Sequence, residues 1–169
     1  MNSPLQTLAT AVVLSLALSG IAAAQEAAPA EQNIIAQETP WQVNCTPTAE
    51  GAEVTCSMVK SLTLNEGTQV MAQAAVVEGD PAVIRLLVPH GMSLPEGLTL
   101  LVDGATVARI SYRTTLPGGA IAATDLTPEL EEALRAGAML QIEGVQNNGA
   151  ALRLEMSLAG FSASVDKLR

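Results

Sequence analysis

Aromatic residues are nearly absent from this chain of 169 residues, which contains one Trp, one Tyr and one Phe. Carbohydrate-binding modules and aromatic cages need stacked rings, so these two binding classes lose support. The hydrophobic core must instead be built from Val, Leu, Ile, Ala and Met.

Positive charge is also scarce, because 8 Lys and Arg face 17 Asp and Glu, which gives a formal net charge of −9. An acidic surface repels the phosphates of nucleic acids and of anionic lipids. We therefore expect no nucleic acid among the partners, and a weak electrostatic preference for basic proteins.

Residues that commonly carry catalysis or bind metals are few, since the chain has one histidine, His90, and two cysteines. It lacks the G-x-S-x-G and H-E-x-x-H motifs and any glycine-rich phosphate loop. A zinc site needs about four ligands, more than these residues supply. Carboxylates leave a calcium site open, but no D-x-D-x-D-G loop is present. We therefore predict no catalytic residues, no metal and no cofactor.

The first 24 residues are predicted to be a cleaved signal peptide. The apolar run Leu8–Ala23 is shorter than the roughly 20 residues of a membrane span, and Ala22-Ala23-Ala24 is a small-x-small cleavage pattern. No Lys or Arg precedes the run, so a retained membrane anchor is the alternative. No cysteine directly follows the run as a lipid-attachment site. The sequence thus predicts export to the periplasm without a stable membrane anchor.

The two cysteines, Cys45 and Cys56, lie eleven positions apart. In an oxidising compartment they are expected to form a disulfide, which would stabilise the fold by roughly 2–3 kcal/mol. Pro47 and Gly51 between them predict a hairpin turn that joins two strands. Two buried free thiols are the alternative, whereas a redox-active pair would need a shorter Cys-x-x-Cys spacing.

Three regions are expected along the chain. Residues 25–40 follow the signal peptide and are rich in Ala, Glu and Gln with two prolines, which predicts a flexible tether. Residues 41–169 are enough for one domain with its own core. In residues 152–158 apolar side chains alternate with Arg153, Glu155 and Ser157, which is the pattern of a half-buried strand.

Further strands and one helix complete the predicted domain. Residues 54–58 and 107–112 also alternate, and each is interpreted as one strand, whereas 69–77 and 83–88 are continuously apolar and suit central strands. Thr127 as N-cap, Pro128 and Gly137 define one short helix. Its acidic residues are interpreted as solvated groups that complement the helix dipole; they are Glu129, Glu131 and Glu132. The sequence therefore predicts a mainly β protein, an antiparallel β-sandwich or partly closed barrel with one short α-helix.

Several segments in order resemble the invasion-associated locus B family of exported bacterial proteins. They are WQVNC, VTCSMV, VIRLLVPHGMSLPEGLTLLVDG, ISYRTTLPGGAIA and MSLAGFSASVDKL, and they span essentially all of the predicted domain. The resemblance implies a periplasmic or envelope-associated β-sandwich without established catalytic residues. It also implies a link to host-cell invasion in some pathogens.

The chain departs from the family pattern at two places. The family usually carries a second cysteine pair, and the corresponding positions here are Thr115 and Gly119. We therefore expect a looser loop between Tyr112 and Ala120. His90 occupies a position that is usually aliphatic.

Four residues are weighed as candidate site residues, and a structural role is preferred for each. His90 is either a turn residue or a general base or pH sensor. Arg109 and Arg113 flank Tyr112 and are either solvated strand residues or a small basic spot. Trp41 is either a core residue beside the disulfide or a stacking platform for a ligand.

These observations favour a non-enzymatic envelope protein that acts by binding another envelope or secreted protein, through strand addition at an exposed sheet edge. One alternative is a periplasmic carrier of a small apolar ligand or lipid inside the sandwich. The other is an envelope hydrolase that uses His90 with a carboxylate.

Overall fold

The computed structural model describes residues 36–47, 54–64, 67 and 69–168. The predicted signal peptide, residues 1–24, lies outside the described residues, as does most of the predicted tether. Cleavage and export therefore remain predictions.

The larger of two antiparallel sheets has seven strands. Its order is β1-β3-β4-β5-β9-β8, and β2 also pairs with β3. The strands are β1 (Gln37–Glu38), β2 (Gln42–Pro47), β3 (Val54–Leu64), β4 (Gln69–Val77), β5 (Val83–Val88), β8 (Tyr112–Leu116) and β9 (Gly119–Asp125).

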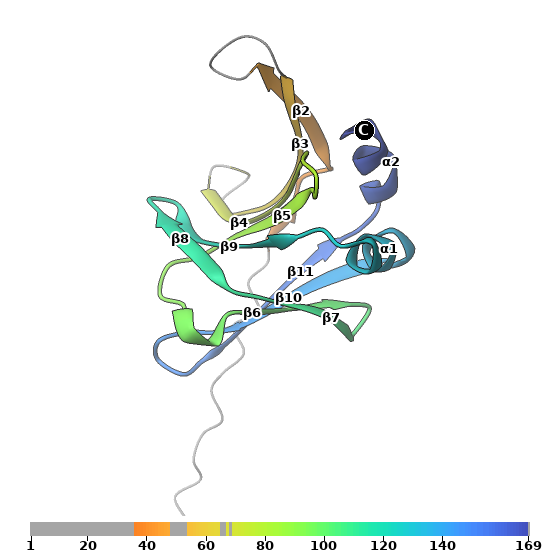
Figure 1. Cartoon of the computed structure of the whole chain (residues 1–169). Helices are drawn as coiled ribbons and strands as arrows, with labels where there is room; N and C mark the ends of the chain where they lie inside the picture. The colour runs from red at the N-terminus through yellow and green to blue at the C-terminus, as the bar shows by residue number, and fades with distance from the viewer. Residues whose placement is uncertain (1–35, 48–53, 65–66, 68, 169) are drawn as a thin grey trace, which may run out of the picture.

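The smaller sheet has four strands in the order β11-β10-β6-β7 and lies below the larger one in Figure 1. The strands are β6 (Leu98–Val102), β7 (Ala105–Ile110), β10 (Met139–Val145) and β11 (Ala151–Ser157). Two stacked antiparallel sheets with helical segments at one side confirm the predicted mainly β sandwich.

The hydrophobic core lies between the sheets, where alternate residues of each strand point inward. In β11, Leu152, Leu154 and Met156 are buried while Arg153 and Glu155 are exposed. The alternation read from the sequence therefore identifies the inner face. The largest fully buried side chains include Phe161, Met58, Ile84, Leu86, Leu100, Ile142 and Met156.

The chain crosses from one sheet to the other at Ser111. The prediction of a single strand over residues 107–112 is therefore wrong, because β7 ends at Ile110 and β8 begins at Tyr112 in the opposite sheet. The Ser111 carbonyl accepts a bond from the Ala123 N–H of β9 (3.4 Å). Alternation continues across the crossing, so periodicity alone does not reveal it.

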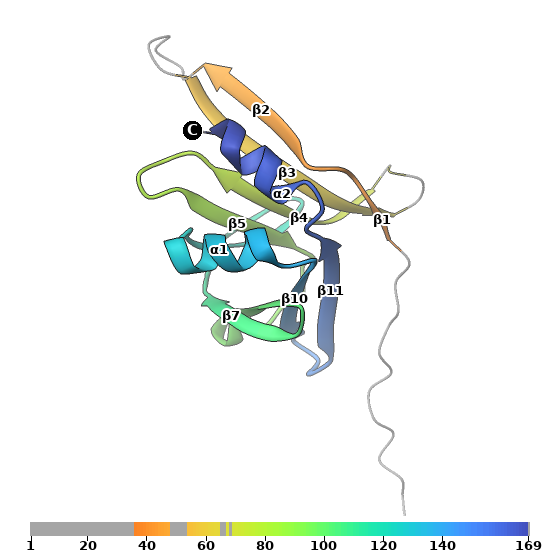
Figure 2. The same cartoon turned by 90° about the vertical axis from the view of Figure 1, so that its right-hand side faces the viewer.

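Two α-helices lie on the same side of the molecule (Figure 2). Helix α1 (Pro128–Ala136) begins as predicted, since the Thr127 Oγ1 accepts a bond from the Leu130 N–H (3.3 Å). A second helix, α2 (Phe161–Val165), was not expected from the sequence. The 3-10 helices are η1 (Leu94–Glu96) and η2 (Asp166–Leu168). No helix among the described residues has the length and apolar character needed to cross a membrane.

Three local expectations need correction. Glu131 is not solvated: it is 9% exposed, and its carboxylate accepts a bond from Arg135 Nε at 2.7 Å. The stretch from Tyr112 to Ala120 is not a loose loop, because β8 and β9 pair across it as a hairpin. At the end of the predicted tether, Gln37 and Glu38 pair with β3 through backbone bonds.

Candidate binding site along the edge of β11

Strand β11 forms one edge of the four-stranded sheet, and only alternate residues of it turn their backbone groups toward β10. Gln146 donates its N–H to the Ala150 carbonyl (2.8 Å), and Leu158 donates to the Ala138 carbonyl (2.8 Å). These two bonds, one before and one after β11, show which residue pairs of the β10–β11 ladder are hydrogen-bonded. The backbone groups of its even-numbered residues therefore face β10.

The odd-numbered residues turn their N–H and C=O groups toward the open side. Ser157 shows this directly, since its N–H donates to both carboxylate oxygens of Glu38 at 3.1 Å. Within the described part of the chain, no hydrogen bond satisfies the outward N–H groups of Ala151, Arg153 and Glu155. β11 thus presents a row of free backbone donors and acceptors, which is the arrangement that accepts an added strand.

A depression of about 820 Å³ follows this open side. Its apolar wall comes from both sheets, because Leu62 of β3 and Leu154 of β11 both line it. These two side chains are core residues with 3% and 4% exposure, so the depression reaches the edge of the hydrophobic core. The other apolar lining residues include Ala36, Met71 and Leu152. We call the depression together with the free edge the β11 groove.

The groove continues over the outer face of the four-stranded sheet, where four residues stand in one cross-strand row. Arg153 lies opposite Glu143, Glu143 opposite Thr99, and Thr99 opposite Arg109. Arg153 donates from Nε to Glu143 at 2.9 Å, whereas no ion pair joins Arg109 to a carboxylate of the described residues. The polar half of the groove therefore contains one paired and one unpaired guanidinium group.

Glu38 lines the groove at its Ser157 end. Its carboxylate lies 2.9 Å from the Lys60 Nζ, and the Lys60 side chain is 5% exposed. A buried ammonium group needs a paired carboxylate, so Glu38 neutralises Lys60 while it occupies the Ser157 N–H. Neither Glu38 nor Lys60 is predicted from the sequence as part of a site. The available signal was the position of Lys60 between Met58 and Leu62 on the inward-facing side of β3.

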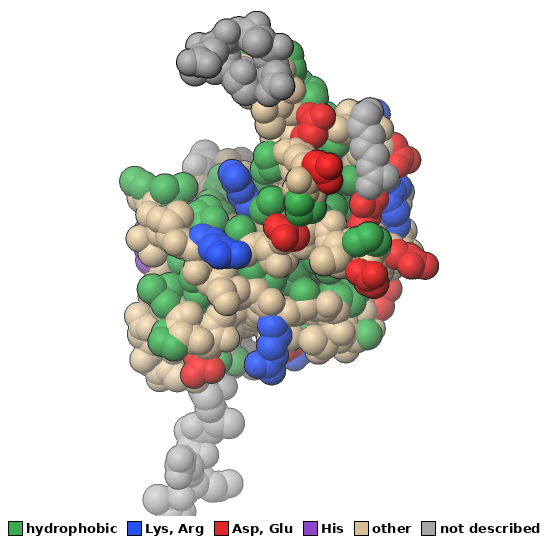
Figure 3. All heavy atoms as spheres, viewed as in Figure 1, with side chains coloured by type: hydrophobic (Ala, Val, Ile, Leu, Met, Phe, Trp, Pro, Cys, Tyr) green, Lys and Arg blue, Asp and Glu red, His purple; other side chains and the backbone are tan. Residues whose placement is uncertain are grey.

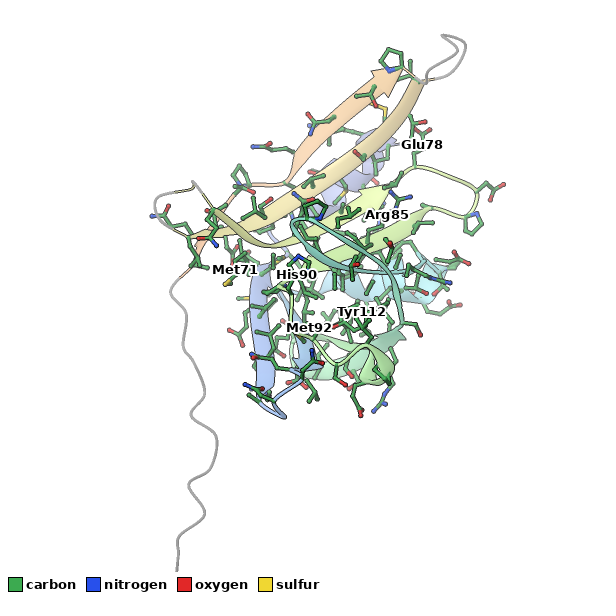
Figure 4. All side chains as sticks on the ribbon, turned by 90° about the vertical axis from the view of Figure 1, so that its left-hand side faces the viewer. Met71, Glu78, Arg85, His90, Met92 and Tyr112 are labelled. Carbon is green, nitrogen blue, oxygen red and sulfur yellow. A yellow bond between two sulfur atoms is a disulfide. The ribbon has the colours of Figure 1, made fainter. Side chains whose placement is uncertain are left out.

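His90 lies on an exposed turn between Pro89 and Gly91. Its Nε2 is 3.2 Å from the Pro117 carbonyl of the β8–β9 turn, and no ion pair joins it to a carboxylate of the described residues. Figure 4 shows it at the surface, away from the labelled Glu78. Among the described residues, His90 therefore has no carboxylate partner of the kind that acid–base catalysis uses.

Arg109 and Arg113 do not share a strand. Arg109 belongs to β7, whereas Arg113 belongs to β8 in the other sheet and donates from Nε to the Ala123 carbonyl (3.3 Å). Tyr112 points inward, and its hydroxyl is buried without a hydrogen-bond partner among the described residues. Burial raises the pKa of the Tyr112 phenol above its ordinary value of 10.0.

Trp41 packs edge-on against Phe161 of α2, with ring centroids 5.4 Å apart and an interplanar angle of 77°. It contacts the core, and its Nε1 has no hydrogen-bond partner in the part of the chain that is described. Cys45 and Cys56 form a disulfide across β2 and β3, with Cα atoms 4.0 Å apart. Because β4 pairs with β3 only from Ser57 onward, the bridge ties the projecting part of the hairpin.

Comparison with known proteins agrees with this architecture. Two curated relatives, the Invasion protein B homologs of Brucella abortus strain 2308 and of Brucella abortus biovar 1 strain 9-941, are each 24% identical over 156 residues, covering 90% of this chain and 90% of the relative. The crystal structure of invasion associated protein b from Bartonella henselae has a TM-score of 0.68 and 24% identity, covering 80% of this chain and 95% of that one, which supports the fold. The family described as Invasion associated locus B (IalB) protein matches residues 41–169. The chain belongs to the invasion associated locus B family.

Proposed function

We propose that this protein is an exported, non-enzymatic binding protein that takes an extended segment of another envelope or secreted protein along β11. The observation that carries the proposal is the row of free backbone groups at Ala151, Arg153 and Glu155 beside an apolar depression. Its relatives are named as invasion proteins, and such binding fits a role in host contact or envelope maintenance.

Both the free backbone groups of β11 and the apolar wall of the groove are needed to bind a guest segment with useful affinity. A hydrogen bond contributes about 0.5–1.5 kcal/mol net, so the few bonds that β11 offers give only weak affinity by themselves. Covering apolar surface adds about 25 cal/mol per Å², so the apolar lining that is still accessible, such as Ala36 and Val145 (37% exposed), is the second source of affinity. Leu62 and Leu154 are already buried and add little. The expected guest segment therefore alternates, with apolar side chains toward the core edge and polar ones toward Arg109 and Arg153.

Proline at position 153 tests the proposal, because it removes an outward N–H without breaking a bond to β10. The matched control is Arg153→Ala, which also loses the ion pair with Glu143 but keeps the N–H. Purified mature protein and both variants are mildly crosslinked in envelope extract, and the captured proteins are quantified by mass spectrometry. A specific partner should be retained by the wild type and by R153A and reduced at least about tenfold by R153P.

Two results would count against the proposal. One is the absence of any specific partner across growth conditions. The other is equal retention by R153P and R153A, which would place the contact away from the β11 edge. Native mass spectrometry of the exported protein adds a separate check, since a co-purified lipid would favour a carrier instead.

A further inference from the structure

The seven-stranded sheet has a second apolar face, which points away from the core. Residues of the central strands that point outward stand in cross-strand rows, such as Val77 opposite Val83 and Leu87 opposite Ile121. They are half-buried and are not part of the core between the sheets. We call this surface the Arg85 face. Its centre consists of Val59, Ala75, Val77, Val83, Arg85, Leu87, Ile121 and Ala123, and the polar residues Ser57, Ser61, Gln73 and Asp125 stand at the margins of the same rows.

Strands with apolar residues on both faces normally belong to sheets that are covered on both sides. The core covers only the inner face here, and Figure 4, which looks onto the larger sheet, shows both helices behind it. The outer face of the smaller sheet is different, because it carries Glu143, Arg153 and Glu155. The larger sheet therefore has the composition of a layer whose outer cover is absent from the described residues.

Arg85 lies in the middle of this apolar face. It is paired across the strands with Ala75 on one side and Ala123 on the other, and its side chain is exposed. No ion pair joins Arg85 to a carboxylate among the described residues. In Figure 3 hydrophobic side chains gather on the left of the molecule, whereas most acidic ones lie on the right near the helices. Asp125, opposite Val83, is the acidic residue at the margin of this face, and it makes no ion pair with Arg85. The exposed Arg85 guanidinium is therefore complementary to a negative charge on a partner.

Three features restrict what covers the Arg85 face. The backbone groups of the central strands β4, β5 and β9 are used in the ladders, so the face offers side chains and not an edge for another strand. A second copy whose twofold axis passes near Arg85 would bring the two Arg85 groups together, at a cost in like-charge repulsion. A net charge of −9 disfavours an anionic lipid surface.

We propose that the Arg85 face binds an amphipathic helix of another protein, with one carboxylate on its apolar side placed against Arg85. A sheet face that is apolar packs well against the apolar stripe of a helix. This surface is separate from the β11 groove and does not depend on strand addition there.

A synthetic peptide of about 18 residues is the probe, designed as a helix with a Leu and Ala stripe, one Glu at the centre of that stripe and an uncharged polar side. Binding to the 15N-labelled mature protein is followed by amide shifts in NMR. We expect shifts at Val59, Leu87 and Ile121. Arg85→Glu should weaken binding at least about tenfold, equal to 1.4 kcal/mol, and a peptide with Lys in place of Glu should bind the R85E variant better than it binds the wild type.

Arg109→Glu is the matched control, since Arg109 is also exposed, on a strand and without an ion pair, but belongs to the other sheet. It should change the affinity by less than about twofold. Arg85→Gln provides a milder variant if R85E reduces the thermal stability. The proposal fails if the shifts are absent or map to Ala151–Glu155, or if R85E and R85Q bind like the wild type. It also fails if shifts at Leu87 grow with protein concentration alone, which shows a second copy, or appear with neutral phosphatidylcholine vesicles.

Discussion

The Glu38 carboxylate lies 2.9 Å from the Lys60 ammonium group and 3.1 Å from the Ser157 N–H. One side chain therefore joins β1 and β3 of the larger sheet to β11 of the smaller one. The contact between Glu38 and Ser157 spans 119 residues of sequence. It fixes the distance between the sheets on the side where the β11 groove opens.

Removing this carboxylate should destabilise the fold. Glu38→Ala leaves the Lys60 ammonium, 5% exposed, without its partner, and breaking a buried pair from one side costs about 3 kcal/mol. The free energy of unfolding is measured by urea denaturation of the protein without its predicted signal peptide, residues 1–24. The control is the double variant Glu38→Ala/Lys60→Met, which should recover much of the loss because no buried charge is left unpaired. A loss below about 0.5 kcal/mol for E38A would show that Lys60 reaches water.

The Tyr112 hydroxyl should be dispensable for stability. It is buried without a partner among the described residues and lies near Gly144, where an added Cβ would stand 3.8 Å from the Tyr112 Oη. An unsatisfied buried hydroxyl costs free energy, so Tyr112→Phe should raise the free energy of unfolding by up to about 1 kcal/mol. Thermal and urea denaturation measure the change, and a clear loss of stability would indicate a polar partner for the hydroxyl.

Gly144 provides the matching steric test. A Cβ at this position would lie 2.7 Å from the Met92 Cε and 2.8 Å from the Leu98 Cδ2. Gly144→Ala therefore forces these side chains to move and should cost about 1–3 kcal/mol. Wild-type stability in this variant would show that Met92 moves aside freely.

The Glu129 carboxyl at the start of α1 should make the free energy of unfolding depend on pH. Hydrogen bonds from the Glu129 backbone N–H and from the Thr127 hydroxyl lower the pKa of the Glu129 carboxyl below its ordinary value of 4.5. Because the folded-state pKa is lowered, this stabilisation is present above the unfolded-state pKa and is lost as the pH falls through the folded-state value. Thr127→Ala should raise the Glu129 pKa in an NMR titration and cost about 1 kcal/mol at neutral pH. An unchanged Glu129 pKa would rule out the Thr127 contact.

The predictable part of this fold is the local part. Alternation placed Leu152 inside and Arg153 outside because a strand has a period of two, whatever it pairs with. Thr127 and Pro128 located the helix start because capping involves only neighbouring residues. The resemblance to the family added the sandwich architecture, which alternation alone left open between a sandwich and a barrel.

The sequence-based predictions that were wrong concern features that depend on contacts between residues far apart in the sequence. The crossing at Ser111 depends on which sheet the residues after it pair with. Gln37 and Glu38 form a strand and not a flexible tether because they pair with β3. Helix α2 is five residues long, too short for sequence signals, and Phe161 within it is held by the core and by Trp41. The candidate site was missed for the same reason, since an edge strand is defined by the absence of a neighbour.

Amide exchange along β11 tests the phase on which the candidate site depends. The N–H groups of Leu152, Leu154 and Met156 face β10, whereas those of Arg153 and Glu155 face the open side. An amide with a ladder bond exchanges only when the strand opens, but a free one exchanges directly with water. In hydrogen–deuterium exchange followed by NMR, Arg153 and Glu155 should exchange at least about tenfold faster than Leu154. Equal protection of all five amides would mean that another segment already covers this edge, and the proposed strand addition would have no vacant site.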